Sequence, residues 1–293
     1  MKNTPNHTSG ASRRFLPKGG NLISRLLRDT GLSHDWFTQK GMHMSDAKYL
    51  DTPQGRRIAY HRIEGASPWV VFLGGLKSDM EGTKAIHLEA WARARGQAFL
   101  RFDYSGHGIS SGRFEDGCIG DWAEDTAEAI GALADGKVVL VGSSMGGWQS
   151  LLFARDHEDR MAGLVTIAAA PDFTEDGYWA SFTDEQKAQL ETDAQIKLPS
   201  DYMEPYIITK RMIEDGRKQL VLRGPLNLPF SVRMLQGTAD SAVSTDRATA
   251  LLDHATSPDM RLTLVKDADH RFSDGPCLGM IEAAVLDVMG ENV

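Results

Sequence analysis

The stretch "KVVLVGSSMGGWQSLLFA", residues 137–154, contains two adjacent serines between glycines and decides the fold prediction. Its first part, Val138–Val141, is a continuous aliphatic run of the kind found in a strand that is buried on both faces. Its last part, Leu151–Ala154, continues in the pattern of a helix. A strand that passes abruptly into a helix through small residues is the setting of the nucleophile elbow, G-x-S-x-G.

The spacing of the glycines selects one of the two serines. Centred on Ser144, the motif reads Gly142-Ser143-Ser144-Met145-Gly146 and fits, whereas centred on Ser143 it would need glycines where Val141 and Met145 stand. Small residues are needed there because side chains beside so tight a turn would collide with the strand and the helix. The motif alone leaves open an ordinary glycine-rich turn with a serine helix cap.

Composition bounds the class of protein. The chain has 293 residues, 41% of them apolar and 25% charged, as in an ordinary globular protein with a sizeable core. A net charge of −8 argues against nucleic acid as a partner. No apolar run approaches the ~20 residues of a membrane span. The two cysteines, Cys118 and Cys277, have no metal-ligand spacing and indicate a reducing compartment. We therefore expect no metal site.

The amino-terminal segment 1–45 differs from the rest of the chain. It holds seven basic and two acidic residues and is rich in Ser, Thr, Asn and Gly. We expect a basic, disordered extension, because such a segment buries little apolar surface. It is either an organelle presequence or the product of an upstream start codon, with the protein proper beginning at Met42 or Met44. Because fold signals begin only at Tyr49, we favour the second alternative, which predicts a cytoplasmic protein. The first predicts a protein of the mitochondrial matrix.

The remainder alternates between strand and helix patterns. The predicted strands are Lys48–Asp51, Arg57–Ile63, Trp69–Leu73, Ala98–Asp103, Val138–Val141, Leu164–Ala168, Ser231–Leu235 and Arg261–Val265. The predicted helices are Thr83–Arg95, Ile119–Ala134, Met145–Asp156, Thr245–His254 and Pro276–Met289. Because Thr52–Gly55 is a turn signal, the first two strands form a hairpin. The alternation that follows predicts an α/β fold, a mostly parallel eight-stranded sheet with helices on both faces.

One segment interrupts this alternation. Residues 173–229 contain several prolines and aromatic residues and no clear strand of the sheet, and a structureless loop of that length is improbable in a compact domain. We expect a small helical cap over the carboxyl ends of the strands, inserted into a core formed by residues 46–172 and 230–293. An ordinary packing excursion is the alternative.

A nucleophilic serine needs a base, and three histidines follow Ser144 in the chain. His157 lies among charged residues at the end of the elbow helix, and His254 ends a later helix, where a cation is a routine cap. His270 follows the last predicted strand, at the sheet edge where open α/β sheets bind ligands. We predict that His270 is the base.

The acid that orients this base is predicted from "SVRMLQGTADSAV", residues 231–243. Asp240 falls in the loop after the penultimate strand, as the order Ser, Asp, His requires. Asp246 is a nearby rival that opens the next helix, and Asp269 adjoins His270, so that its side chain points away from the ring. Ser144, Asp240 and His270 are therefore the predicted catalytic residues.

An acyl-transfer site also needs two backbone amides for the oxyanion. The amide of Met145, just after the nucleophile, is one candidate. The other is the amide of Leu76 in "VVFLGGLKSDMEGTKA", residues 70–85, where Gly75 lets the backbone approach a substrate closely. Aromatic residues of the cap are candidates for the wall of an apolar pocket or, equally, for the packing of the cap. These are Trp179, Phe182, Tyr202 and Tyr206.

Four segments together resemble a known family. "LGGLKSDMEGTKA", "RFDYSGHGISSG", "LVGSSMGGW" and "DADHR" are similar to the α/β-hydrolases, in the branch of the mitochondrial palmitoyl-protein thioesterase that also cleaves acyl glucuronides, with its bacterial relatives. The resemblance runs from about Tyr49 to the carboxyl terminus. It implies a serine hydrolase without a cofactor, with Ser144, Asp240 and His270 as its triad. The implied substrates are acyl thioesters or activated carboxyl esters, including acylated proteins.

Two other classes of function remain to be weighed. The same fold hosts C–C hydrolases and peptidases, whereas a dehalogenase would need an aspartate where Ser144 stands. A non-enzymatic binder on the same scaffold is disfavoured, because a degenerate copy tends to lose its serine or histidine.

Overall fold

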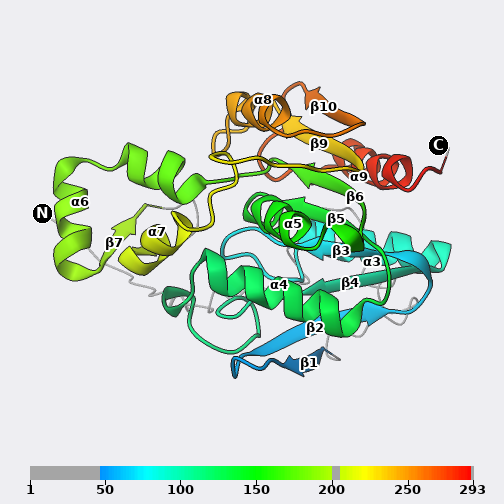
Figure 1. Cartoon of the computed structure of the whole chain (residues 1–293), viewed down its shortest axis with the longest axis horizontal. Helices are drawn as coiled ribbons and strands as arrows, with labels where there is room; N and C mark the ends of the chain where they lie inside the picture. The colour runs from blue at the N-terminus through cyan, green and yellow to red at the C-terminus, as the bar shows by residue number, and fades with distance from the viewer. Residues whose placement is uncertain (1–46, 200–204, 292–293) are drawn as a thin grey trace, which may run out of the picture. The chain divides into compact units, whose positions relative to one another are not determined.

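The computed structural model describes residues 47–199 and 205–291 (Figure 1). The predicted extension 1–45, with its alternative starts at Met42 and Met44, lies outside the described residues. The predicted pocket residue Tyr202 also lies outside them.

Eight strands form one sheet in the spatial order β1-β2-β4-β3-β5-β6-β9-β10. They are β1 (Lys48–Asp51), β2 (Arg57–Ile63), β3 (Ala66–Leu73), β4 (Gln97–Phe102), β5 (Val138–Ser143), β6 (Met161–Ile167), β9 (Ser231–Gly237) and β10 (Met260–Val265). The pairs β1–β2 and β2–β4 are antiparallel, and the other neighbours are parallel. The prediction of a mostly parallel sheet with an antiparallel opening is confirmed.

Some strand ends differ from the prediction by a few residues. β6 begins at Met161 instead of Leu164, because the ladder to β5 already pairs Met161 with Val138. β4 ends at Phe102, one residue earlier than predicted. Asp103 follows it and uses its carboxylate to accept backbone amides from two loops. The apolar pattern marks the buried part of a strand, whereas partner availability sets its ends.

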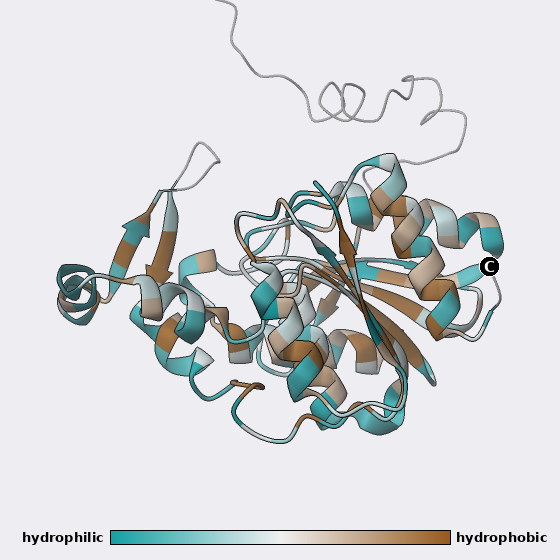
Figure 2. Ribbon diagram, turned by 90° about the horizontal axis from the view of Figure 1, so that it is seen from above, coloured by the Kyte–Doolittle hydropathy of each residue, from teal (hydrophilic) through white to brown (hydrophobic). Residues whose placement is uncertain are grey.

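Helices cover both faces of the sheet, as predicted. They are α3 (Thr83–Arg95), α4 (Ile119–Leu133), α5 (Met145–Asp156), α8 (Thr245–His254) and α9 (Gly275–Val288). Alternate residues of β3 separate two cores: Val71 packs in a cluster with residues of α4, α5 and α8, and Val70 in a cluster with residues of α3 and α9. Figure 2 shows the hydrophobic strands enclosed between these helices.

The segment between β6 and β9 has secondary structure of its own. It contains a π-helical turn η3 (Thr174–Trp179), α6 (Asp184–Asp193), β7 (Gln195–Leu198), β8 (Tyr206–Thr209) and α7 (Lys210–Gly216). The antiparallel pair β7–β8 departs from the expectation of helices alone. Its buried Ile196 and Ile208 are β-branched residues that face each other across the ladder, which favours strand pairing over helix. We call residues 173–229 the cap.

Candidate active site

Ser144 occupies a strained turn between β5 and α5. Its backbone has φ 55° and ψ −117°, a conformation that costs a non-glycine residue about 1–3 kcal/mol. A Cβ at Gly146 would stand 2.0 Å from the carbonyl oxygen of Leu73, and one at Gly142 would stand 2.3 Å from that of Gly146. The glycines of the motif are therefore required by space, as the sequence predicts.

Three side chains form a hydrogen-bonded series at this turn. Nε2 of His270 is 3.2 Å from Oγ of Ser144, and Nδ1 of His270 is 2.8 Å from Oδ2 of Asp240. The side chain of Asp240 is fully buried, and that of His270 is partly exposed. Because an ionised Asp240 only accepts, Nδ1 of His270 donates to it and leaves the lone pair of Nε2 toward Ser144.

The carboxylate of Asp240 is held on both oxygens. Oδ1 accepts the amides of Ala242 and Val243, each at 2.8 Å, and Oδ2 accepts Nε2 of Gln236 at 3.1 Å in addition to His270. Burial works to raise the pKa of Asp240, but the hydrogen bonds from His270 and the two amides keep it below its ordinary value. Asp240 is therefore charged at neutral pH and able to stabilise an imidazolium.

No motif in the sequence indicates a role for Gln236. Gln236 is the penultimate residue of β9, and its side chain is buried. Its Nε2 also donates to the carbonyl oxygens of Gly237 and Val243. A single glutamine at the end of an apolar strand carries no motif. Its only signal was its place four residues before Asp240.

The rival residues have other partners. Nε2 of His254 is 2.7 Å from the carbonyl oxygen of Gly224, and the ring of His157 packs against Phe153. Asp246 lies in the first turn of α8. Oδ1 of Asp269 accepts the amide of Phe272 at 3.0 Å.

The two predicted oxyanion donors belong to segments that adjoin Ser144. A Cβ on Gly75 would stand 3.3 Å from Cβ of Ser144, which brings the loop of Leu76 against the serine. Met145 begins α5, so its amide has no partner inside the helix. Within residues 47–199 and 205–291, no hydrogen bond is found for the amide of Leu76 or of Met145.

Asp103 fixes the loop that carries Gly75 and Leu76. Its two carboxylate oxygens accept the amide of Met80 at 2.6 Å and that of Ile109 at 3.0 Å, which ties this loop to residues 104–112. Burial raises the pKa of Asp103 to about 6, so it is largely ionised at neutral pH. The close approach also requires Gly108, where a Cβ would collide with the carboxylate.

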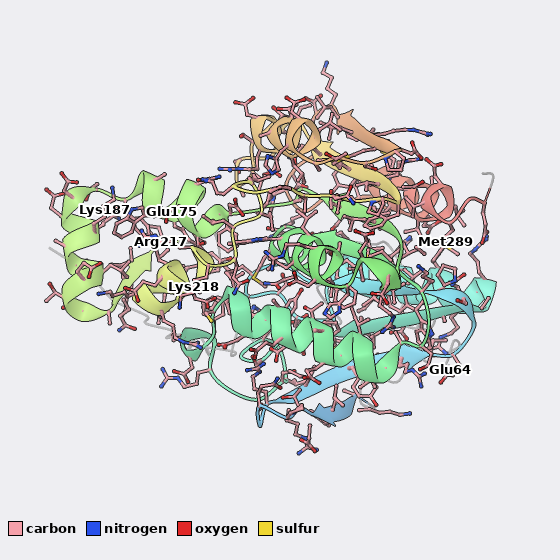
Figure 3. All side chains as sticks on the ribbon, viewed as in Figure 1. Glu64, Glu175, Lys187, Arg217, Lys218 and Met289 are labelled. Carbon is pink, nitrogen blue, oxygen red and sulfur yellow. The ribbon has the colours of Figure 1, made fainter. Side chains whose placement is uncertain are left out.

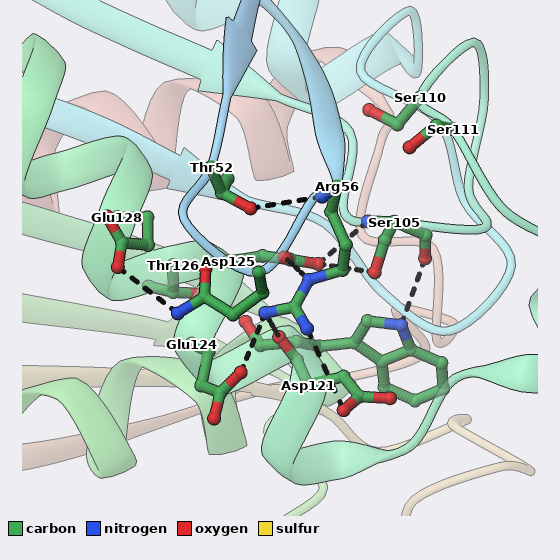
Figure 4. A network of polar contacts seen from close by, with 12 residues as sticks. Thr52, Arg56, Ser105, Ser110, Ser111, Asp121, Glu124, Asp125, Thr126 and Glu128 are labelled. Atoms are coloured by element: carbon green, nitrogen blue, oxygen red, sulfur yellow. Dashed lines mark hydrogen bonds and ion pairs between the residues drawn. The ribbon is translucent and has the colours of Figure 1, made fainter.

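A polar network holds residues 104–112 from the other side (Figure 4). The buried carboxylate of Asp125 accepts Nε of Arg56 at 2.6 Å, and both the amide and the hydroxyl of Ser105. Trp122 donates Nε1 to the carbonyl of Ser105 at 3.0 Å. The network leaves no charge of Asp125 unpaired and makes this loop a rigid support for the one before it.

The predicted pocket residues of the cap fall into two groups. Phe182 is 5% exposed and stacks on Tyr178, which favours the packing alternative for this residue. Two cations lie near the ring of Trp179: the guanidinium of Arg217 is 4.5 Å from the ring centroid and Nζ of Lys187 is 5.4 Å from it. Both cations are labelled on the cap in Figure 3.

Tyr206 has a different neighbourhood from the other cap aromatics. Nζ of Lys77 is 5.6 Å from the ring centroid of Tyr206 and 5.3 Å from that of Phe114. Because Lys77 directly follows Leu76, this contact joins strand β8 of the cap to the loop of the predicted oxyanion donor. The contact places Tyr206 near the loop that carries the predicted oxyanion donor.

The two cysteines are poor candidates for a second nucleophile. Cys118 and Cys277 are buried, and burial raises the pKa of each thiol to about 12. The described residues contain no group of three or more His, Cys, Asp or Glu side chains arranged to hold a metal ion. In the same part of the chain, no helix is long and apolar enough to cross a membrane.

Comparison with known proteins gives a consistent result. Residues 68–206 match the model of the alpha/beta hydrolase fold family. The palmitoyl-protein thioesterase ABHD10, mitochondrial, of Bos taurus is 31% identical over 273 residues, which cover 92% of this chain and 88% of that protein.

Two solved structures are similar over most of their length. A putative hydrolase from Agrobacterium vitis S4 has a TM-score of 0.79 and 35% identity, covering 83% of this chain and 98% of that one. The alpha/beta hydrolase domain-containing protein 10 from mouse has a TM-score of 0.78 and 29% identity, covering 84% of this chain and 99% of that one.

Proposed function

Because this chain belongs to the α/β-hydrolase family, we propose that it is a serine hydrolase that cleaves acyl esters or thioesters through a Ser-His-Asp triad. The observation that carries the proposal is the hydrogen-bonded series from Ser144 through His270 to Asp240, which begins at a strained serine. A packing role alone would not explain a buried carboxylate that fixes the tautomer of a partly exposed histidine.

The proposed reaction has two halves. In the first, Oγ of Ser144 bonds to the acyl carbon while His270 takes its proton, and His270 then gives that proton to the departing alcohol or thiol. In the second, His270 takes a proton from water, the resulting hydroxide attacks the acyl-enzyme, and Ser144 recovers its proton as the acid leaves. Asp240 stabilises the imidazolium in both halves.

The amides of Leu76 and Met145 are the proposed oxyanion donors. Each such donor lowers the barrier by about 3–4 kcal/mol, because it is aimed in advance at the charge of the tetrahedral intermediate. Gly75 keeps the backbone close enough to Ser144 for the amide of Leu76 to reach that oxygen.

For the substrate we propose an acyl group held between the edge of the sheet and the cap. The substrate class proposed is a small acyl ester or thioester, or an acylated protein; the related bovine protein is named a palmitoyl-protein thioesterase, which supports the thioester and the acylated protein. An apolar groove gains about 0.8 kcal/mol per buried methylene. Since the cap is small, we expect the site to be filled by short to medium chains and to tolerate varied leaving groups.

Two measurements test this function. A fluorophosphonate probe should label the chain at Ser144, which separates an enzyme from a binding protein in one gel. A series of p-nitrophenyl esters and acyl thioesters from two to sixteen carbons, below their micelle concentrations, should give a kcat/KM that rises and then levels. A flat profile contradicts the acyl groove, and activity confined to peptide amides or C–C substrates contradicts the esterase.

The cellular location has two proposals. The cytoplasm follows if translation begins at Met42 or Met44, and the mitochondrial matrix follows if residues 1–45 are translated as a presequence and then removed. The name of the bovine relative includes "mitochondrial", which supports the second. Fractionation of the native cell decides between them, because it measures the compartment in which the protein is found.

A further inference from the structure

Lys84 connects two parts of the chain that the proposed chemistry uses together. It is the second residue of α3, and its Nζ donates to the carbonyl oxygen of Arg271, 187 residues away, and lies 3.5 Å from Oγ of Ser273. Arg271 directly follows His270. Resting on the proposed function, we infer that Lys84 is a positioning residue that holds the loop of His270 so that its imidazole faces Ser144.

The loop that carries His270 has a strained backbone. It leaves β10 through Asp267 at φ 61° and continues through Phe272 at φ 49°, two non-glycine residues in the left-handed region. Such backbone persists only where its surroundings fix it. Before His270, the carbonyl of Ala268 accepts the amide of Ala239. After His270, the side chain of Phe272 is buried in the core, and the amine of Lys84 adds a polar contact from α3 to the carbonyl oxygen of Arg271.

Lys84 is itself held by a rigid element. The buried face of α3 packs under the sheet through Ala85 and Leu88, and one turn after Lys84 the Nε2 of His87 is 2.5 Å from Oε1 of Glu282 on α9. The helix directly follows the loop that carries Gly75 and Leu76. Lys84 therefore links the side of the site that holds the oxyanion donor to the side that holds the base.

The charge of Lys84 suits this task. Burial lowers the pKa of Lys84 to about 8, with Asp269 opposing the shift and Arg271 adding to it. At neutral pH the ammonium form dominates, and a charged donor makes a stronger bond to a carbonyl than a neutral one. The motif Gly82-Thr83-Lys84-Ala85, one of the segments that carry the family resemblance, thereby gains a physical role.

The test compares three variants on a p-nitrophenyl ester that the wild-type protein hydrolyses. Lys84→Met should lower kcat by about ten- to a hundredfold with KM changed less than about threefold, because a small displacement of a catalytic group is costly. Lys84→Arg, which keeps a cationic donor, should recover most of this loss. Lys137→Met is the matched control, because Nζ of Lys137 donates to the carbonyl oxygen of Met161 at 3.4 Å at the end of β5 away from Ser144, and it should keep kcat within about twofold.

A spectroscopic readout measures position without turnover. In a Ser144→Ala background, the downfield proton resonance of the His270 Nδ1–H bonded to Asp240 should be sharp, and Lys84→Met should broaden or abolish it while Lys84→Arg retains it. Where Lys84→Met does not fold, Lys84→Gln, whose amide is too short to reach Arg271, takes its place with the same expectations.

The inference is overturned if Lys84→Met keeps wild-type kcat and resonance, or if Lys137→Met loses as much kcat as Lys84→Met. Failure of the proposed function has a different signature. In that case the wild-type protein neither hydrolyses esters nor takes up the fluorophosphonate at Ser144, while the resonance still reports whether Lys84 positions His270.

Discussion

His270 and Ser144 are 126 residues apart in the chain, and Nε2 of the imidazole is 3.2 Å from the hydroxyl Oγ. Ser144→Ala should therefore abolish fluorophosphonate labelling and turnover, because no other serine shares this contact within the described residues. The neighbouring Ser143→Ala is the matched control and should retain both, apart from a modest change. Labelling that moves to Ser143, or full activity in Ser144→Ala, would contradict the assignment.

The base and its acid can be tested against residues of the same type. His270→Ala should lower kcat by several orders of magnitude, and Asp240→Asn by roughly 10³–10⁴, since Asn does not stabilise the imidazolium or fix its tautomer. His254→Ala and His157→Ala should cost little, because their rings have partners elsewhere. Steady-state kinetics with matched melting curves give the comparison, and equal losses in all four variants would refute it.

Gln236 offers a test of the support behind Asp240. Gln236→Leu removes the amide that donates to Oδ2 of Asp240 and should lower kcat by about tenfold, because the carboxylate then turns more freely. Gln149→Leu is the control: Gln149 is also fully buried, but its Nε2 donates to the carbonyl of Ile119.

Both glutamine variants should lower the free energy of unfolding by about 1–3 kcal/mol, as expected when a buried hydrogen bond is lost. Only Gln236→Leu should lower kcat beyond that. If the two variants have the same kcat, Gln236 has no positioning role.

The lowered pKa of Lys84 predicts that activity falls at alkaline pH. Its ammonium form is the charged donor to Arg271, and since burial lowers the pKa of Lys84 to about 8, that charge is present below this pH and lost above it. Asp269 and Arg271 of the same loop and Cys277 of α9 face this amine.

The expected result is a kcat that falls above about pH 8 in the wild-type protein. In Lys84→Arg the fall should move to higher pH, because a guanidinium keeps its charge throughout this range. Initial rates from pH 6 to 10, corrected for the uncatalysed hydrolysis, make the measurement. A wild-type rate that stays level through pH 9 would count against the role of the charge.

The sequence determined the fold because each of its signals is local. Aliphatic runs such as Val138–Val141 predict the strands, and the turn at Thr52–Gly55 predicts the hairpin. The helical patterns that separate the later strands predict a parallel sheet, and only the strand ends differ by a few residues. The choice of Ser144 over Ser143 is also local, since it depends on which neighbours are glycine. His270 and Asp240 were predicted from chain order, because the carboxyl ends of parallel strands meet at one edge of a sheet.

Only the tertiary structure decided which polar groups stand behind these residues. Nothing in the sequence around Gln236 or Lys84 indicates that one donates to Asp240 and the other to the carbonyl after His270. No pattern in the sequence predicts the pairing of β7 with β8 or the two cations near Trp179. A motif reflects the spacing of residues that are close in the chain. The hydrogen bond between Lys84 and Arg271 instead joins residues 187 positions apart, and it depends on how α3 and the loop after β10 pack against the same sheet.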